Sequence, residues 1–285
     1  MATKDIEKSL YNGRHLVHFK NASHRYYVDG ILRPGVTTIL GKVLAKPGLA
    51  LWPLNMALKH LSAKLPTITE KDLEAARQAH IQKRDAGSDT GTIVHYLVEQ
   101  KLRGIAQTRG QHFNFTATSK LSEYPEEVQK AFGSFLAWFD VQAPLPVAVE
   151  QVVYSRTWKY PGTFDSILDI EGVVYLCDLK TTNASQDAPH GVYAENFVQL
   201  GAYYLAYEEQ RRYELAHGGT SLAEINDLMI ISCRKDGGLN THTASEFGLT
   251  PANCAKLWKC ILTLHTTLGP LGNKLARPPA LAGRS

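Results

Sequence analysis

Two aspartates and a lysine interrupt hydrophobic sequence in the middle of the chain. Asp165 follows Gly162 and Thr163 in the segment YPGTFDSILDI, and Asp178 and Lys180 end the run VVYLCDLK. Successive side chains of a strand point to opposite faces, so Asp178 and Lys180 should share one face. Two carboxylates in a poorly solvated place repel each other unless a cation joins them, and all-oxygen ligation favours Mg²⁺ or Mn²⁺ over zinc. These residue types indicate a divalent-metal site beside an ammonium group.

The segments that carry these residues are expected to bring them together. The turn Glu171-Gly172 separates them, and counting six or seven residues back along each arm brings Asp165 and Asp178 to similar heights. Glu150, in the preceding run VAVEQVV, is a candidate third acid. A lysine near such a site can orient or deprotonate water and shield the charge of a phosphate. The alternative is an exposed Asp–Lys pair on an edge strand, which would contribute almost nothing to stability.

From Pro146 onward, hydrophobic periodicity predicts an α/β arrangement with a sheet covered on both faces. The predicted elements are strands over 147–155, 162–170 and 173–181, a helix over 193–215, strands over 227–234 and 241–247, and a closing helix over 250–268.

The first part of the chain follows a different pattern, with short strands and then helices. We expect strands over 15–20, 24–30 and 31–36, and helices over 37–44, 49–65, 69–83, 88–104 and 125–142. The chain should therefore divide into a hairpin and helical part over 1–145, a core over 146–268, and a disordered tail over 269–285.

Composition narrows the class of protein only moderately. Hydrophobic residues make up 44% and charged residues 20% of the chain, which is typical of a globular domain. The formal net charge of +4 permits a nucleic-acid partner without requiring one. The four cysteines form no CxxC pair, and no apolar segment is long enough for a membrane span or a signal peptide. We expect free thiols and a cytoplasmic protein, in the bacterial host if the chain is phage-encoded.

The order of these motifs resembles the PD-(D/E)XK nuclease superfamily. GTFD, then CDLKTT, then QLGAYYLA are similar to its RecB-like branch, which includes phage recombination exonucleases and a mitochondrial genome-maintenance exonuclease. Upstream, GTIVHYLVE resembles the helix in which that branch carries a histidine, and VTTIL with KPGLALW resembles phage members. The resemblance spans roughly residues 24–210. It implies a restriction-endonuclease-like core, with a central mixed sheet flanked by helices, and a helical and hairpin N-terminal half.

The resemblance also implies a set of metal ligands. They would be Asp165, Asp178, the backbone carbonyl of Leu179, and His95 from the upstream helix. By itself, a histidine on an apolar helix is more typical of a packed core residue. Glu99, one turn later, would either orient His95 or lie at the surface.

Other residues take catalytic roles by the same resemblance. Lys180 would be the catalytic lysine, and Gln199 with Tyr203 matches the Q-x-x-x-Y element, whose i and i+4 positions share one helix face. Glu150 aligns with the acidic residue of the first core strand. Phe164 departs from the family's usual proline before the first aspartate, as is common in this branch.

The implied activity is a Mg²⁺-dependent DNA exonuclease, with Mn²⁺ as the other candidate metal, acting in recombination, repair or replication. The alternatives are a structure- or sequence-specific DNA endonuclease on the same core and an inactive DNA-binding protein. A phage-type enzyme also implies a single-strand annealing protein as a candidate partner. No iron–sulfur cluster is expected, because no cysteine precedes Cys177. Candidate DNA-binding residues are Arg33, Lys46, Trp52 and Arg84.

Overall fold

The computed structural model describes residues 5–44, 51–108, 121–183, 191–219 and 222–275. For residues 82–88, 108 and 270–275 it describes the backbone alone.

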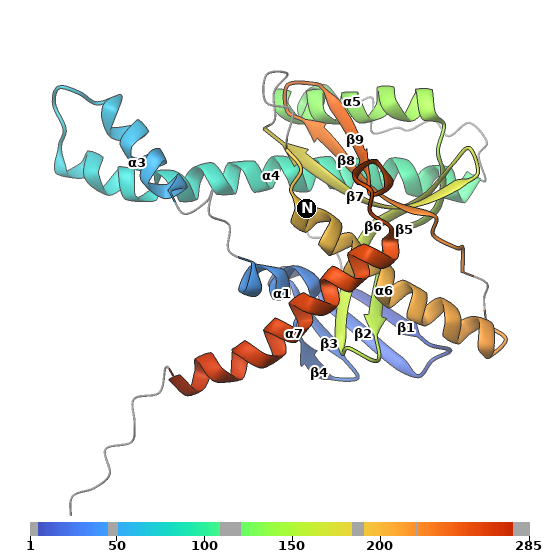
Figure 1. Ribbon diagram of the computed structural model, residues 1–285. Coiled ribbons are helices and arrows are strands. Elements are labelled where there is room, and N and C mark those ends of the chain that lie inside the picture. The colour runs from blue at the N-terminus through green and yellow to red at the C-terminus, as the bar shows by residue number, and fades with distance from the viewer. Residues whose placement is uncertain (1–4, 45–50, 109–120, 184–190, 220–221, 276–285) are drawn as a thin grey trace, which may run out of the picture.

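A mixed sheet of five strands forms the centre of the molecule (Figure 1). Its strands follow chain order, namely β5 (Leu145–Ser155), β6 (Tyr160–Ile170), β7 (Val173–Thr182), β8 (Asp227–Arg234) and β9 (Leu239–Thr243). All neighbouring pairs are antiparallel except β7 and β8, which are parallel. The helix α6 (Ala194–Ala216) makes the crossover that a parallel pair requires.

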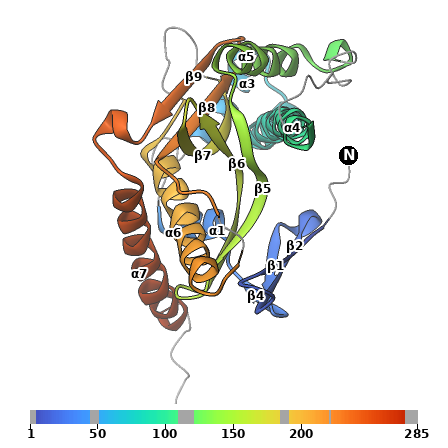
Figure 2. The same ribbon diagram turned by 90° about the vertical axis from the view of Figure 1, so that its right-hand side faces the viewer.

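Helices cover both faces of this sheet (Figure 2). One face packs against α6 and α7 (Pro251–Leu275) around the fully buried Trp258, whose ring contacts Tyr160 at 5.1 Å between centroids. The other face packs against α4 (Glu70–Thr108) and α5 (Glu126–Gln142), with Phe132 and Phe135 buried between them. Phe132, Phe135 and Phe139 of α5 therefore belong to the core. These two apolar layers fix the strands that carry the acidic residues.

A second sheet lies beside β5. Its strands are β1 (Ile6–Leu10), β2 (His15–Lys20), β3 (Arg25–Val28) and β4 (Ile31–Arg33), all antiparallel. Tyr11, Val17 and Val28 form a small core with Val152 and Tyr154 of β5. β1 was not predicted, since its sequence IEKSL is mostly polar and exposed.

The helices of the N-terminal part differ from expectation in one respect. Thr69 and Asp72 cap the start of α4 through reciprocal hydrogen bonds, at the place where a helix over 69–83 was expected to begin. The expected second start near Ser88 or Thr90 is wrong, because α4 continues unbroken to Thr108. The Thr90 hydroxyl instead faces Glu127 of α5, at 3.5 Å. The helix α3 (Trp52–Ser62) packs on the first part of α4, and the pair extends away from the rest of the molecule (Figure 1).

Several element ends also shift. The short helix α1 (Val36–Val43) follows β4 as expected. Beyond Thr243, the predicted strand gives way to a 3₁₀ turn over Ser245–Phe247. α7 continues to Leu275, so residues 269–275 are helical where we expected a disordered tail. Residues 276–285 lie outside the described part.

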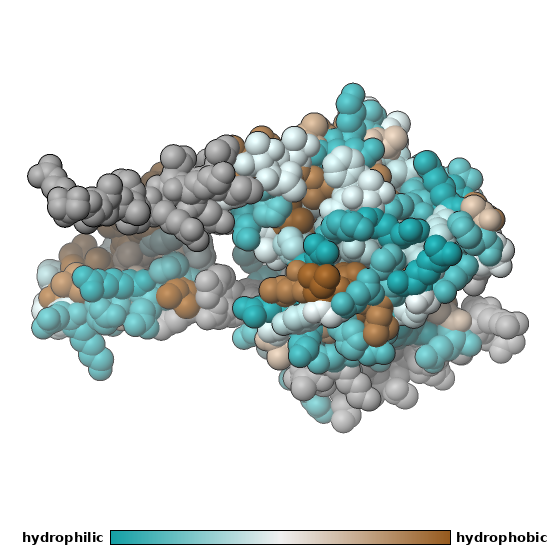
Figure 3. Space-filling model, turned by 90° about the horizontal axis from the view of Figure 1, so that it is seen from below, coloured by the Kyte–Doolittle hydropathy of each residue, from teal (hydrophilic) through white to brown (hydrophobic). Residues whose placement is uncertain are grey.

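The surface of the described part is mainly hydrophilic in the view from below, with a hydrophobic patch near its centre (Figure 3). Large exposed apolar side chains of the four-stranded sheet include Leu16, Ile31 and Leu32. Among the described helices, none combines the length and the apolar composition that a bilayer crossing needs.

The close approach of α6 and α7 yields a test of the fold. A Cβ atom at Gly201 would overlap the backbone carbonyl of Cys254, so Gly201→Ala should destabilise the protein by roughly 1–3 kcal/mol or more. Gly133 of α5 has open space around it, so Gly133→Ala should stabilise by about 0.5–1 kcal/mol. Urea unfolding of both variants measures the difference. Equal effects would contradict this packing.

Candidate active site

The hairpin of β6 and β7 positions the aspartates. Its turn residues Glu171 and Gly172 have φ of 53° and 85°, as in the tight turns that favour the right-handed twist of hairpins. Backbone pairing starts with Ile170 opposite Val173 and ends with Ser166 opposite Cys177. Continuing this register by one residue aligns Asp165 with Asp178, as the counting predicted.

The two strands separate at this point. The amide of Leu179 donates a hydrogen bond of 2.6 Å to Oδ2 of Asp165. A side-chain carboxylate thus takes the place of a backbone acceptor on β6. The opening leaves Asp165 half-buried and accessible to groups from other elements.

Glu150 reaches this opening from β5 through an unusual backbone. Its φ is 47°, a left-handed value within a strand, while its neighbours Val149 and Gln151 pair with Ser166 and Phe164. Such a conformation costs a residue other than glycine on the order of 1 kcal/mol or more, and it is found mostly where function requires it.

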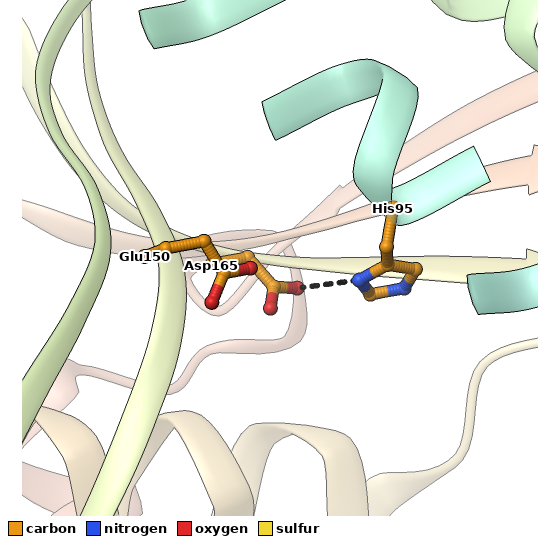
Figure 4. A group of neighbouring side chains, drawn as sticks. All are labelled: His95, Glu150 and Asp165. Atoms are coloured by element: carbon orange, nitrogen blue, oxygen red, sulfur yellow. Dashed lines mark ion pairs between the residues drawn. The ribbon is translucent and has the colours of Figure 1, made fainter. Parts of the chain in front are cut away.

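His95 completes a group of three possible metal ligands (Figure 4). Ligand atoms of His95, Glu150 and Asp165 all lie within 4.8 Å of one another. His95 Nδ1 lies 3.8 Å from Asp165 Oδ2, and its ring extends from α4 toward the two acids (Figure 4). A cavity of about 10 Å³ adjoins them, which is about the space of one water molecule.

Burial makes these acids electrostatically unfavourable as they stand. Desolvation, followed by the charges of Asp165 and Glu99, raises the pKa of Glu150 to about 9. Burial also raises the pKa of Asp178, which is 3% exposed. The carboxylates of Glu150 and Asp165 and the imidazole of His95 surround a space that fits a divalent cation, which would favour the charged form of Glu150.

Lys180 belongs to a second, adjoining group. Its Nζ lies 2.5 Å from Oδ2 of Asp178 and donates to Oε1 of Gln199 at 3.4 Å. The amide nitrogen of Gln199 donates to Oδ1 of Asp178 at 3.2 Å and to the hydroxyl of Tyr203 at 3.0 Å. Burial acts to lower the pKa of Lys180, but the opposing effect of the Asp178 and Asp165 carboxylates is larger. The net shift raises the pKa of Lys180 above its ordinary value, so the lysine is a cation here.

The structure therefore arranges the predicted residues in two linked groups. Asp178 is paired with Lys180 and lies outside the group of three that contains Asp165. Leu179 connects the groups through its amide, and its carbonyl as a ligand stays a prediction. Glu99 and His95 both line the small cavity, and Glu99 accepts a hydrogen bond of 2.7 Å from Arg103. The hydrogen bonds of the described residues include none between Glu99 and His95.

The two candidate DNA-binding residues whose side chains the structure describes, Arg33 and Trp52, lie on different elements. Arg33 is half-buried on β4, and its Nε has no hydrogen-bond partner within the described part of the chain. Trp52 begins α3 and packs edge-on against His80 at 6.0 Å. Lys46 and the side chain of Arg84 lie outside the described residues.

Sequence reasoning missed one tyrosine beside the site. The hydroxyl of Tyr26, on β3, lies 2.8 Å from Oγ1 of Thr163. Burial raises the pKa of Tyr26 to about 12, and the charge of Glu150 adds to this effect. Only the packing of the second sheet against β6 brings Tyr26 here, so no local motif indicates it.

A groove was also missed. It has a volume of about 640 Å³ and begins at Lys180 and Gln199. One wall is α1, through Leu40 and Leu44, and the other is the start of α6, with Tyr193 and Asn196. Its walls come from distant segments, so no single motif predicts it.

Residues 57–237 match the family model of the PD-(D/E)XK nuclease superfamily. This match covers more than half of the chain and contains the group of three ligands and the Lys180 group. The chain belongs to the PD-(D/E)XK nuclease superfamily. Membership confirms the expected restriction-endonuclease-like core and implies a metal-dependent nuclease, with His95, Glu150 and Asp165 as a possible metal site.

Other comparisons add little to this assignment. No curated protein matches the chain. Among solved structures, the chain is similar to the crystal structure of SSO0001, with 11% identity and a TM-score of 0.29. That match covers 75% of this chain and 85% of SSO0001, and likeness at this level carries no functional argument.

The desolvated, half-buried Glu150 makes stability in the absence of metal depend on pH. Its pKa is about 9 in the folded protein against an ordinary 4.5, so the unfolded chain binds fewer protons between these values. The free energy of unfolding should therefore fall as pH rises from about 4.5 to 9, by at most about 1.4 kcal/mol per pH unit from this group. Urea unfolding in EDTA at pH 6 and pH 8.5 measures this loss.

The matched variant is Glu150→Gln, which cannot ionise. It should show a shallower pH dependence in EDTA than the parent. Adding Mn²⁺ at pH 8.5 should restore stability to the parent and much less to the variant. A parent protein equally stable at both pH values in EDTA would contradict the burial of this acid.

Proposed function

We propose that the protein is a Mg²⁺- or Mn²⁺-dependent deoxyribonuclease of the RecB-like branch that acts as an exonuclease. The observation that carries this proposal is the convergence of His95, Glu150 and Asp165 beside the Lys180–Asp178 pair. The order of motifs supports the branch and a phage-type role in recombination, repair or replication. Residues 146–268 would form the nuclease core, and the N-terminal part would contribute His95.

His95, Glu150 and Asp165 would hold the metal, and Asp178, on which the charges of Asp165 and His95 act, is a further proposed ligand. When bound, a divalent cation would polarise the phosphate and lower the pKa of its bound water, which supplies a nucleophile at neutral pH. The cation would favour the ionised form of Glu150, whose pKa is raised in its absence. α4 positions His95 for this role, with the imidazole ring directed toward Asp165 of β6.

Lys180 would stabilise negative charge on the phosphate oxygens as the bond is cleaved. As an ammonium group it is a donor and cannot take a proton, so in this arrangement it positions water or phosphate. Gln199 keeps the lysine and Asp178 in place through hydrogen bonds to both. Tyr203 holds Gln199 from the same face of α6, as the spacing of the two residues allows.

The groove beside Lys180 supports a strand-shaped substrate. Its volume lies within the usual range of ligand sites, and its walls combine leucines with polar groups. Tyr193, 62% exposed at the start of α6, offers a ring on which a base can stack. Arg33 and Trp52 are further proposed contacts for DNA, while Lys46 and Arg84 rest on the sequence alone.

Removing the proposed ligands or the lysine should abolish cleavage of end-labelled DNA. With Mg²⁺ or Mn²⁺, Asp165→Ala and Lys180→Ala should each lower the rate by at least about 100-fold, since each loses a charge next to the reacting phosphate. EDTA should stop the parent enzyme. The control is Asp169→Asn, an acid on the same strand that accepts a hydrogen bond only in the β6–β7 turn. If Asp165→Ala cleaves as fast as the parent, the assignment fails.

The form of DNA distinguishes the proposed exonuclease from an endonuclease. An exonuclease needs an end, so circular single-stranded DNA should stay intact while linear DNA of the same sequence is degraded to mononucleotides. Cleavage of the circle at a comparable rate would favour the endonuclease. Binding of both forms without cleavage of either, in Mg²⁺ or Mn²⁺, would favour an inactive DNA-binding protein.

A further inference from the structure

A cluster of arginine and aromatic side chains lies beyond the C-terminal end of β5, away from the proposed metal ligands. It is built from the turn between β1 and β2, the residue that follows β5, and the end of α6. Its members are Tyr11, Arg14, Arg156, Tyr213 and His217.

The aromatic rings hold two guanidinium groups close together. The guanidinium carbon of Arg156 lies 5.1 Å from the ring centres of both Tyr11 and Tyr213, and that of Arg14 lies 5.5 Å from Tyr213. The ring of His217 stacks on Tyr213 at 4.0 Å. Contact with a ring uses the face of a guanidinium group, whereas its N–H donors lie in the plane and suit phosphate oxygens.

The arginines of this cluster carry charges that no ion pair offsets in the described part of the chain. Within the described ranges, neither Arg14 nor Arg156 forms an ion pair, in contrast to Arg211, which lies 2.7 Å from Glu208. An acid that influences Tyr11, Glu209, already accepts three hydrogen bonds, from the Ser155 hydroxyl and from the amide and hydroxyl of Thr157. Arg14 is exposed and Arg156 is half-buried, so both can meet a ligand from solvent.

The cluster is connected to the active site by β5 and the sheet beside it. Glu150 and Arg156 are six residues apart, about 20 Å in an extended strand. The second sheet runs along this interval, with Tyr26 near Glu150 and the Tyr11 hydroxyl bonded to the Tyr154 carbonyl at 2.7 Å. Arg33 and Arg156 both lie close enough to Tyr154 for their charges to act on its hydroxyl.

We infer that Arg14 and Arg156 form a second phosphate-binding site, which holds the DNA backbone about six nucleotides from the bond that is cut, at roughly 3.4 Å per nucleotide. This inference rests on the proposed nuclease function. Stacked arginines would fix the direction of the bound strand without reading its sequence.

The test compares Arg14→Gln with Arg212→Gln, which removes the same charge from an exposed side chain adjacent to Tyr213. Binding of a 20-base-pair duplex is measured by fluorescence anisotropy in EDTA at several NaCl concentrations. Arg14→Gln should weaken binding roughly five- to tenfold and reduce the salt slope by about 1, whereas Arg212→Gln should change neither appreciably. Arg156→Lys should keep the slope but weaken binding, since lysine retains the charge and loses the planar fork.

A small substrate separates this inference from the proposed function. Hydrolysis of thymidine 5′-(p-nitrophenyl phosphate) with Mn²⁺ should be the same in the parent and in Arg14→Gln, because this substrate cannot reach the cluster. Equal weakening of duplex binding by Arg14→Gln and Arg212→Gln would overturn the second site. So would unchanged binding with a lower melting temperature, which would make the cluster purely structural. Failure of the parent to bind or cleave any DNA would instead refute the nuclease.

Discussion

Carboxylates held where water is scarce are the constraint on which this structure depends. Glu150, Asp165 and Asp178 lie at the opening between strands, and their mutual repulsion must be offset within a few ångströms. Two of the offsetting groups, the ammonium of Lys180 and the amide of Leu179, come from β7 itself. The remaining imbalance is what a divalent cation would remove, so the same feature that opposes folding favours metal binding.

The architecture distributes the other compensating groups over both faces of the sheet. α4 supplies His95 from one face, and α6 supplies Gln199 from the other. Each helix is held by its own apolar layer, so the relative positions of imidazole and amide are determined by core packing. A site built in this way tolerates little change in either layer.

Much of this arrangement follows from sequence, where local rules suffice. The Glu171-Gly172 turn set the hairpin register, and period-two alternation brought Asp178 and Lys180 to one face. Rules based on neighbouring residues failed where contacts between segments distant in the sequence determine the structure. The sequence pattern predicted two helices, over 69–83 and 88–104, with a break between them that α4 does not have.

The contribution of Glu150 likewise depends on a left-handed φ that glutamate rarely adopts. Tyr26 and the residues that line the groove lie on segments whose sequences contain no motif that indicates a functional site. These features require the packed structure, because none of them follows from the spacing of residues along the chain.

The unbroken course of α4 has a mechanical consequence. A helix of 39 residues is about 58 Å long, and it joins the outlying α3 packing surface to the imidazole of His95 without a hinge. Any partner that tilts the N-terminal end of α4 moves a continuous helix that carries His95, 25 residues from that end, beside Asp165. If α4 moves as a rigid body, a force on its N-terminal end changes the distance between His95 and Asp165.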